Sequence, residues 1–253
     1  MIKAITFDLW DTVFIDDSDE PKRKAAGRLS KHEERRSLVF EFAQKHKDVS
    51  KDLVNSICNT VDAAFRKVWH DQFVTWKVVE RMEIIFKGLG INLSSEEMEK
   101  VVKLHEEMEL EFRPDFIDGV GEAIEELHRS YKLGVISDAI FSPGRVLREL
   151  LRGEELLQYF DHFVFSDEIG NSKPQPVVFE SVYKKFGINP SELIHIGDRE
   201  HNDILGSKKN GIHSLLCIAV IDRDSQNTKA DGIFSDYIDL PDIIKSLNER
   251  IRK

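Results

Sequence analysis

The sequence predicts an α/β protein, a doubly wound and mostly parallel β-sheet with an inserted all-helical domain. Three observations favour this fold class. Short apolar runs that end beside a polar residue recur along the chain, amphipathic helical stretches separate the later runs, and one long interval after the first run has helical patterns but no convincing strand. Strands that alternate with helices pair in parallel, with both faces of the sheet covered.

Six segments are predicted as strands. The first covers residues 4–7 and ends at Asp8, so its carboxyl end delivers a carboxylate. In an open parallel sheet the ligand crevice lies outside the carboxyl ends of the strands, so polar residues at these ends are expected to converge. The later predicted strands are residues 133–136, 162–165, 193–196, 214–218 and 232–234.

The interval from residue 15 to residue 114 is predicted as the helical insertion. Ser50 and Ser94 are suitable N-caps, and Gly88 and Gly90 are suitable helix ends. The expected boundaries are therefore residues 1–14 and 115–253 for the α/β core and 15–114 for the helical domain. The helices expected in this interval are residues 31–47, 50–71, 75–88 and 94–112.

Charge and composition exclude several classes of protein. The 253 residues include 36 Lys and Arg against 46 Asp and Glu, a formal charge of −10, which is unsuited to a general nucleic-acid binder or an anionic membrane partner. No apolar run approaches the roughly 18 residues of a membrane-spanning helix, and the N-terminus does not resemble a signal peptide. Cys58 and Cys217 are too far apart in sequence to indicate a disulfide framework or a zinc site. We expect a cytoplasmic monomer or homodimer.

Five polar residues are candidates for chemistry. Asp8, Ser137 and Asp198 follow predicted strands, and Lys173 and Asp203 lie in polar segments between apolar ones. Each signal alone is weak, because Asp198 and Asp203 also suit helix N-caps and a single lysine is usually a surface residue. Their order along the chain is more informative than any one of them.

Four short segments in this order resemble the motifs of the haloacid dehalogenase (HAD) superfamily. They are DLWDTV at residues 8–13, the strand ending at Ser137, SDEIGNSKPQP at 166–176 and IGDREHNDILG at 196–206. The resemblance covers residues 1–14 and about 115–253. The helical insertion is similar to the family's C1-type cap, which acts as a lid over the active site.

The resemblance implies catalytic roles for individual residues. Asp8 would be the nucleophile that forms a covalent aspartyl intermediate, and Lys173 would neutralise both Asp8 and the phosphoryl oxygens. Ser137, with the neighbouring main chain at Asp138, would hold the phosphoryl oxygens, and Thr12 would orient the first motif.

The resemblance also implies a magnesium site, because two anionic groups must approach each other during the reaction. Asp8, Asp198 and Asp203 would bind Mg²⁺, Asp203 directly or through a water molecule, and the backbone carbonyl of Trp10 would complete the protein ligands. Mg²⁺ prefers oxygen ligands and keeps several waters, which suits a few carboxylates plus substrate.

Trp10 departs from the family pattern and leaves the function open. HAD phosphatases normally have a second Asp two residues after the nucleophile, which acts as general acid and base, whereas hydrolytic dehalogenases of the family have an aromatic residue there. The retained Asp198 and Asp203 favour a Mg²⁺-dependent phosphohydrolase of a small phosphorylated molecule. The alternatives are a 2-haloacid dehalogenase and a catalytically impaired relic that binds phosphate or a partner. Asp11 is an alternative source of the missing acid, but adjacent side chains of an extended chain point to opposite faces, which disfavours Asp11 as a substitute for the residue at position 10.

The basic and aromatic residues of the insertion receive weaker interpretations. The runs at residues 21–24 and 33–36 are expected to be solvated, with contact to an anionic substrate as the alternative for the first. Trp69, Phe73 and Trp76 are expected in the core of the helical domain, and the alternative is that one of them faces the substrate.

Overall fold

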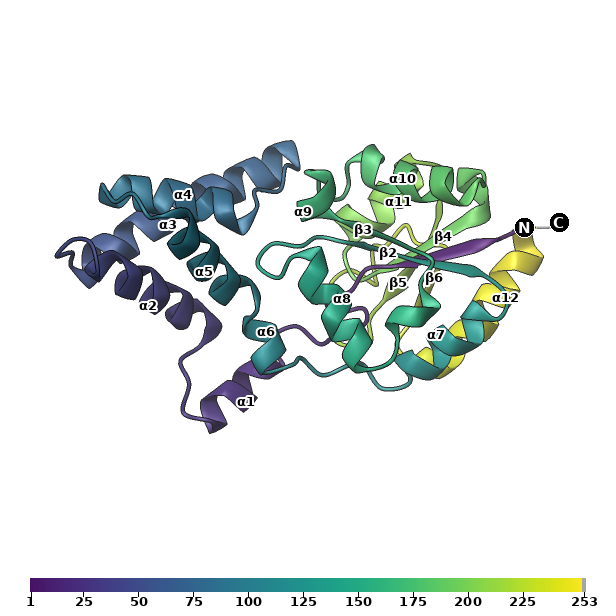
Figure 1. Ribbon diagram of the computed structural model, residues 1–253. Coiled ribbons are helices and arrows are strands. Elements are labelled where there is room, and N and C mark those ends of the chain that lie inside the picture. Colours follow the sequence, from purple (N-terminus) through teal and green to yellow (C-terminus); the bar gives the residue numbers. More distant parts are fainter. Residues whose placement is uncertain (252–253) are drawn as a thin grey trace.

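The computed structural model describes residues 1–251, which form an α/β part and a helical part (Figure 1). Within these residues one six-stranded, all-parallel sheet has the order β3-β2-β1-β4-β5-β6. The predicted α/β fold is confirmed. The strands are β1 Ala4–Phe7, β2 Lys132–Ser137, β3 His162–Phe165, β4 Leu193–Gly197, β5 His213–Cys217 and β6 Gly232–Phe234.

The central strand β1 pairs with β2 on one side and β4 on the other. Its last residue, Phe7, lies opposite Val135 of β2 and Ile196 of β4. The chain thus leaves the sheet at the same level on three adjacent strands. Since the strand order reverses at β1, this is the point where a ligand crevice is expected.

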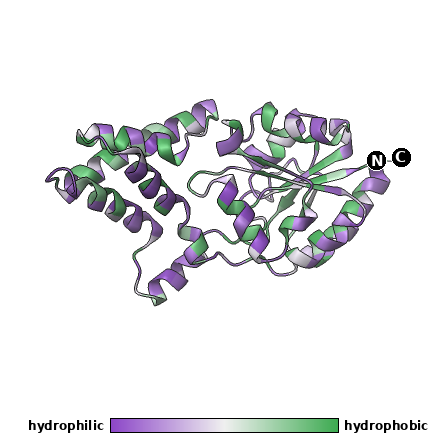
Figure 2. Cartoon of the chain, viewed as in Figure 1, coloured by the Kyte–Doolittle hydropathy of each residue, from purple (hydrophilic) through white to green (hydrophobic). Residues whose placement is uncertain are grey.

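Both faces of the sheet are buried under helices (Figure 1). Ile5 and Phe7 pack into a cluster with residues of α7, α8 and α12, whereas Ala4 points to the opposite face and packs with α10. This alternation is the two-residue period of a strand, and Figure 2 shows the matching hydropathy, with helices that carry hydrophobic residues on one side. The helices are α7 Val120–His128, α8 Gly144–Gly153, α9 Ser166–Ile169, α10 Pro176–Phe186, α11 Leu205–Lys209 and α12 Leu240–Ile251.

The helical part has its own hydrophobic core. Phe42, Cys58, Phe86 and Val101 are buried together, one from each of α2 to α5. Ser50 and Ser94 cap α3 and α5 as predicted. The helices are α1 Asp19–Ala25, α2 Lys31–Gln44, α3 Lys51–Gln72, α4 Val78–Leu89, α5 Ser95–Glu106 and α6 Met108–Glu111.

Three expectations about this part need correction. The helix predicted over 94–112 is interrupted at Glu107, and α4 begins later than predicted because residues 73–75 form backbone hydrogen bonds with 170–172 instead. The basic run at 21–24 is not uniformly solvated, because it lies in α1 and Arg23 is fully buried against Glu34. Cys58 and Cys217 are buried free thiols. Across residues 1–251, each helix is too short or too polar to cross a membrane.

Candidate active site

Asp8 begins the loop after β1 and lies at the centre of the candidate site. Its backbone N–H donates to the Ile196 carbonyl of the adjacent strand at 2.8 Å, which fixes the start of the loop. The side chain is 10% exposed, and its Oδ1 lies 2.8 Å from Lys173 Nζ. The Asp8 carboxylate is therefore held beside a cation and still accessible from the crevice.

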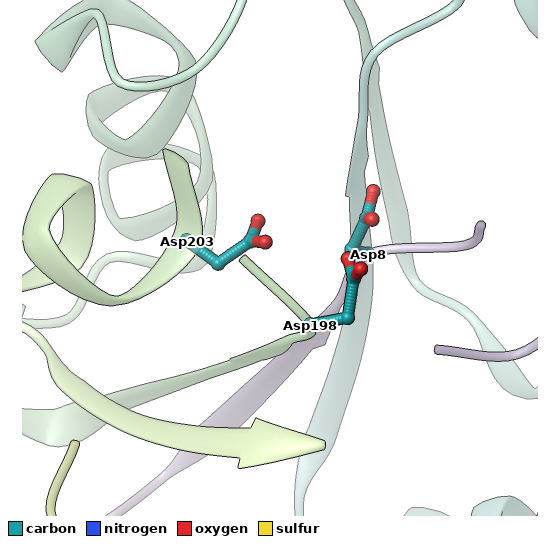
Figure 3. A group of neighbouring side chains, drawn as sticks. All are labelled: Asp8, Asp198 and Asp203. Carbon is teal, nitrogen blue, oxygen red and sulfur yellow. The ribbon is translucent and has the colours of Figure 1, made fainter. Parts of the chain in front are cut away.

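Asp8, Asp198 and Asp203 bring one carboxylate oxygen each within 4.8 Å of one another (Figure 3). Asp198 follows β4, and Asp203 lies in the π-helical turn Glu200–Ile204 that comes next. Gly197 makes this turn possible, because a Cβ there would collide with the Asp203 side chain. Two neighbouring strands and one tight turn thus bring Asp8 together with two carboxylates that lie about 190 residues later in the chain.

Lys173 links two of these carboxylates. Its Nζ lies 2.6 Å from Asp203 Oδ1 as well as 2.8 Å from Asp8, and it donates to the Ile136 carbonyl at 3.1 Å. Burial alone would lower the pKa of this ammonium group, but Asp203 and Asp8 outweigh burial and hold the pKa well above its usual value. Lys173 is therefore a permanent positive charge between the two carboxylates.

Asp203 is held by a network that includes His195, a residue that the sequence analysis missed. His195 on β4 is fully buried, with Nε2 3.1 Å from Asp203 Oδ1 and Nδ1 2.9 Å from Thr6 Oγ1. Although burial favours the neutral acid, Lys173 and His195 lower the pKa of Asp203. Burial also lowers the pKa of His195, so a neutral ring that donates from Nε2 fits this arrangement.

Asp198 is less well compensated than Asp203. Burial, followed by repulsion from Asp203 and Asp8, raises the pKa of Asp198 to about 7. Among the described residues its Oδ1 has no hydrogen-bond partner, although the side chain is only 2% exposed. A buried carboxylate oxygen without a donor, beside two other carboxylates, suits a hard divalent cation such as Mg²⁺.

Arg223, in the loop between β5 and β6, was also missed. Its guanidinium hydrogen-bonds to Asp198 Oδ2 and lies 2.6 Å from Asp11 Oδ2. Asp11 Oδ1 also accepts the backbone N–H of Asp16 at 3.0 Å. Asp11 does not line the candidate cavity formed within residues 1–251. These contacts commit Asp11 to a structural ion pair and argue against it as the replacement acid.

The remaining predicted residues lie around this centre with different degrees of access. Ser137 is 2% exposed, and its hydroxyl has no partner within residues 1–251. Asp138 Oδ1 accepts the Lys173 backbone N–H at 3.0 Å, and burial raises the Asp138 pKa to about 7. Thr12 is fully buried and accepts a hydrogen bond at its carbonyl from Tyr237. Thr12 therefore has no direct access to the crevice.

A cavity of about 320 Å³ lies between the two parts of the molecule. The α/β part contributes Asp8, Lys173 and Trp10, whose ring packs edge-on against Phe14. Trp69 of α3 lines the same cavity, so it is placed to contact a ligand bound there. The other lining residues are Asp16, Asp17, Lys31, Arg35, Glu109, Asp138, Ile140, Phe141, Ser142, Arg199, Asn202 and Asp203.

A family model and individual relatives were found to be similar to this chain. The family model for haloacid dehalogenase-like hydrolases matches residues 31–217. Glyceraldehyde 3-phosphate phosphatase from Pyrococcus abyssi is 34% identical over 85 residues, which cover 34% of this chain and 34% of that protein. The matched segment thus spans about a third of this relative's length.

Two solved structures share the overall fold. One is 2-haloacid dehalogenase from Pseudomonas syringae pv. Tomato, with a TM-score of 0.71 and 21% identity over 98% of this chain and 100% of that chain. The other is a HAD phosphatase from Thermococcus onnurineus, with a TM-score of 0.63 and 22% identity over 96% of this chain and 98% of that chain. At these identities the likeness concerns the fold.

Proposed function

The chain belongs to the haloacid dehalogenase-like hydrolases, and we propose that it is a Mg²⁺-dependent phosphohydrolase that acts on a small phosphorylated molecule. The observation that carries this proposal is the group of three carboxylates, two of them joined by the buried Lys173. A second support is the phosphatase activity in the names of a matched relative and of a solved structure with this fold.

Asp8 is the proposed nucleophile. Its carboxylate oxygen forms a bond to phosphorus while the bond from phosphorus to the leaving-group oxygen breaks, which gives an aspartyl phosphate. Water then cleaves this acyl phosphate, releases inorganic phosphate and restores Asp8. Lys173 neutralises the nucleophile and the incoming oxygens, and the Ser137 hydroxyl, which has no partner within residues 1–251, is the proposed donor to a phosphoryl oxygen.

Asp8, Asp198, Asp203 and the Trp10 carbonyl are the proposed ligands of Mg²⁺. When bound, the ion would neutralise charge on the phosphoryl oxygens. The unpartnered Asp198 Oδ1 supports the donor set, within the part of the chain that the structure describes.

Trp10 determines which phosphate esters are suitable. No carboxylic acid stands two residues after Asp8, so the leaving group departs without a proton from that position. Aryl and acyl phosphates have leaving groups that tolerate this, whereas alkyl phosphates need protonation. We therefore propose a substrate whose leaving group is stable as an anion.

The test is hydrolysis of p-nitrophenyl phosphate with Mg²⁺, with a chelator, and by the Asp8→Asn variant. Phosphate release that needs Mg²⁺ and is lost in Asp8→Asn is the expected result. In a graded series of aryl phosphates the rate should rise with leaving-group acidity. A flat series would contradict the missing general acid.

A 2-haloacid dehalogenase is the second candidate, because Trp10 lines the cavity where a halide would leave without a proton. Release of chloride from 2-chloropropionate in the presence of a chelator would favour it. Silence on both substrates would favour a phosphate-binding or partner-binding relic. A cytoplasmic location and a monomeric or homodimeric state stay predictions.

A further inference from the structure

A second cavity, of about 240 Å³, lies inside the helical part of the molecule. Helices α1 to α5 line it, together with Asp17 and with Phe141 from the loop after β2, and the lining includes the carboxylates of Glu20 and Asp62 as well as basic side chains. Asp17, Lys31, Arg35 and Phe141 line this inner cavity and the candidate active-site cavity alike. The two cavities therefore adjoin, with Phe141 between them.

Arg81 of α4 lines the inner cavity and is only 2% exposed. Its guanidinium lies 4.7 Å from the Phe65 ring centroid and 4.4 Å from that of Phe141, and it donates to the Ile140 carbonyl. Within residues 1–251 its Nε has no hydrogen-bond partner and no carboxylate forms an ion pair with it. Arg81 is thus a buried cation whose direct contacts are two rings and one carbonyl, while the carboxylates of Asp62 and Glu106 act on it only from a longer range.

Other cations of the helical part, which are buried or partly buried, each have a carboxylate partner. Arg23 pairs with Glu34, Arg36 pairs with Asp62, and Lys31 lies 2.8 Å from Asp19. A buried charge without a counter-ion is costly, and proteins normally pair it. The missing anion at Arg81 is therefore a local exception, beside a cavity with room for one.

Arg35 adds a second positive group at the junction of the two cavities. It stacks on Phe141 at 4.0 Å, and in the described part of the chain its Nε has no partner. Glu109 lies 3.5 Å from Arg35 but is shared with Lys31 at 3.4 Å and with the hydroxyl of Ser142. Burial lowers the pKa of Arg81 to about 10, which leaves it charged at neutral pH.

We propose that Arg81, flanked by Arg35, forms a binding site for an acidic group, a carboxylate or a phosphate, in the inner cavity. The favoured source of this group is the far end of the substrate, which would then be a phosphate ester with a second anionic group. That assignment rests on the proposed phosphoryl site at Lys173, whereas the inner site itself does not. A separate small anion is the other source of the same chemistry.

The experiment measures binding of non-hydrolysable probes to the full chain with Mg²⁺ by calorimetry. The probes are a series of ω-carboxyalkyl phosphonates of increasing length, alkyl phosphonates of matched length, and malonate. At least one carboxyalkyl phosphonate should bind about ten- to a hundredfold more tightly than its alkyl partner, the gain expected for a charge-assisted hydrogen bond.

Three variants test the assignment to Arg81. Arg81→Met should abolish the difference, and Arg81→Lys should retain part of it. Arg129→Met changes the net charge equally on an exposed side chain and should retain the full difference. If Arg81→Met does not fold, the comparison of the two probe series on the unmodified chain still shows whether a second acidic group strengthens binding.

The outcomes separate the two proposals. Malonate and an alkyl phosphonate are also titrated together. If both bind at once, and Arg81→Met loses the malonate binding, a separate anion is the occupant of the inner site. Malonate binding without any phosphonate binding supports the inner site and contradicts the proposed phosphoryl site. Equal binding of both phosphonate series together with no malonate binding overturns the inner site and leaves Arg81 as a tie between α4 and the Ile140 loop.

Discussion

Replacing Arg223 with methionine should make the chain bind Mg²⁺ more tightly. The guanidinium hydrogen-bonds to Asp198 Oδ2, so a cation that binds the other oxygen, Oδ1, meets a carboxylate whose charge Arg223 already neutralises in part. A hydrogen bond between charged groups contributes about 1.5–3 kcal/mol. The Arg223 side chain is 25% exposed, so water screens part of the interaction and the lower end applies. The expected gain is therefore about tenfold in Kd.

The assay is calorimetric titration of Mg²⁺ at pH 8.5, above the pKa of about 7 of Asp198, so that protons do not compete with the metal. Arg199→Met is the matched control. Its Nε is 3.9 Å from Asp198 Oδ2 in an exposed side chain, and we expect a change of about threefold or less. An unchanged or weaker Mg²⁺ affinity in Arg223→Met would refute the reasoning, because the guanidinium and the metal would then share Asp198 without competing.

Three further predictions concern the same centre. Trp10→Asp should raise turnover of alkyl phosphates by about 10²–10⁴ by restoring a general acid; an unchanged rate in folded protein would contradict this. Because burial raises the Asp198 pKa from 3.8 to about 7, the metal-free folded chain keeps a proton that the unfolded chain releases, and its stability falls as pH rises from about 4 to 7. The rise in melting temperature on adding Mg²⁺ should therefore be larger at pH 8 than at pH 6, and an equal rise would argue against Asp198 as a ligand. Gly197→Ala should weaken Mg²⁺ binding at least about tenfold, because the new Cβ displaces Asp203, and calorimetry of the folded variant checks it.

Local sequence patterns predicted most of the fold because strands and capped helices are encoded locally. The run at residues 4–7 is a strand, and Ser94 caps a helix as expected. The failures occur where tertiary contacts replace local preference. Residues 73–75 have a helical environment in the sequence, but they hydrogen-bond to 170–172, and no local pattern reports a partner almost a hundred residues away.

The residues of the candidate site likewise include some that local sequence patterns predicted and some that they could not. Asp8 and Asp198 could be predicted because both follow apolar runs, and parallel strands bring such ends together. Arg223 lies in a polar loop with no periodicity, so its ion pairs depend on the path of that loop. His195 stands inside a strand, where its alternation indicates burial but gives no sign of Asp203 as its partner.

The contacts between the two parts of the molecule link substrate selection to the chemistry. The loop after β2 begins beside Ser137, and the helical part contacts it through Arg81, which donates to Ile140, and through Glu109, which accepts from Ser142. The segment before Lys173 is likewise bonded to residues 73–75. Elements that carry the proposed phosphoryl-binding groups are therefore positioned partly by the helices that line the candidate active-site cavity. A substitution such as Arg81→Met should consequently lower kcat as well as raise KM, because small displacements of catalytic groups reduce transition-state stabilisation.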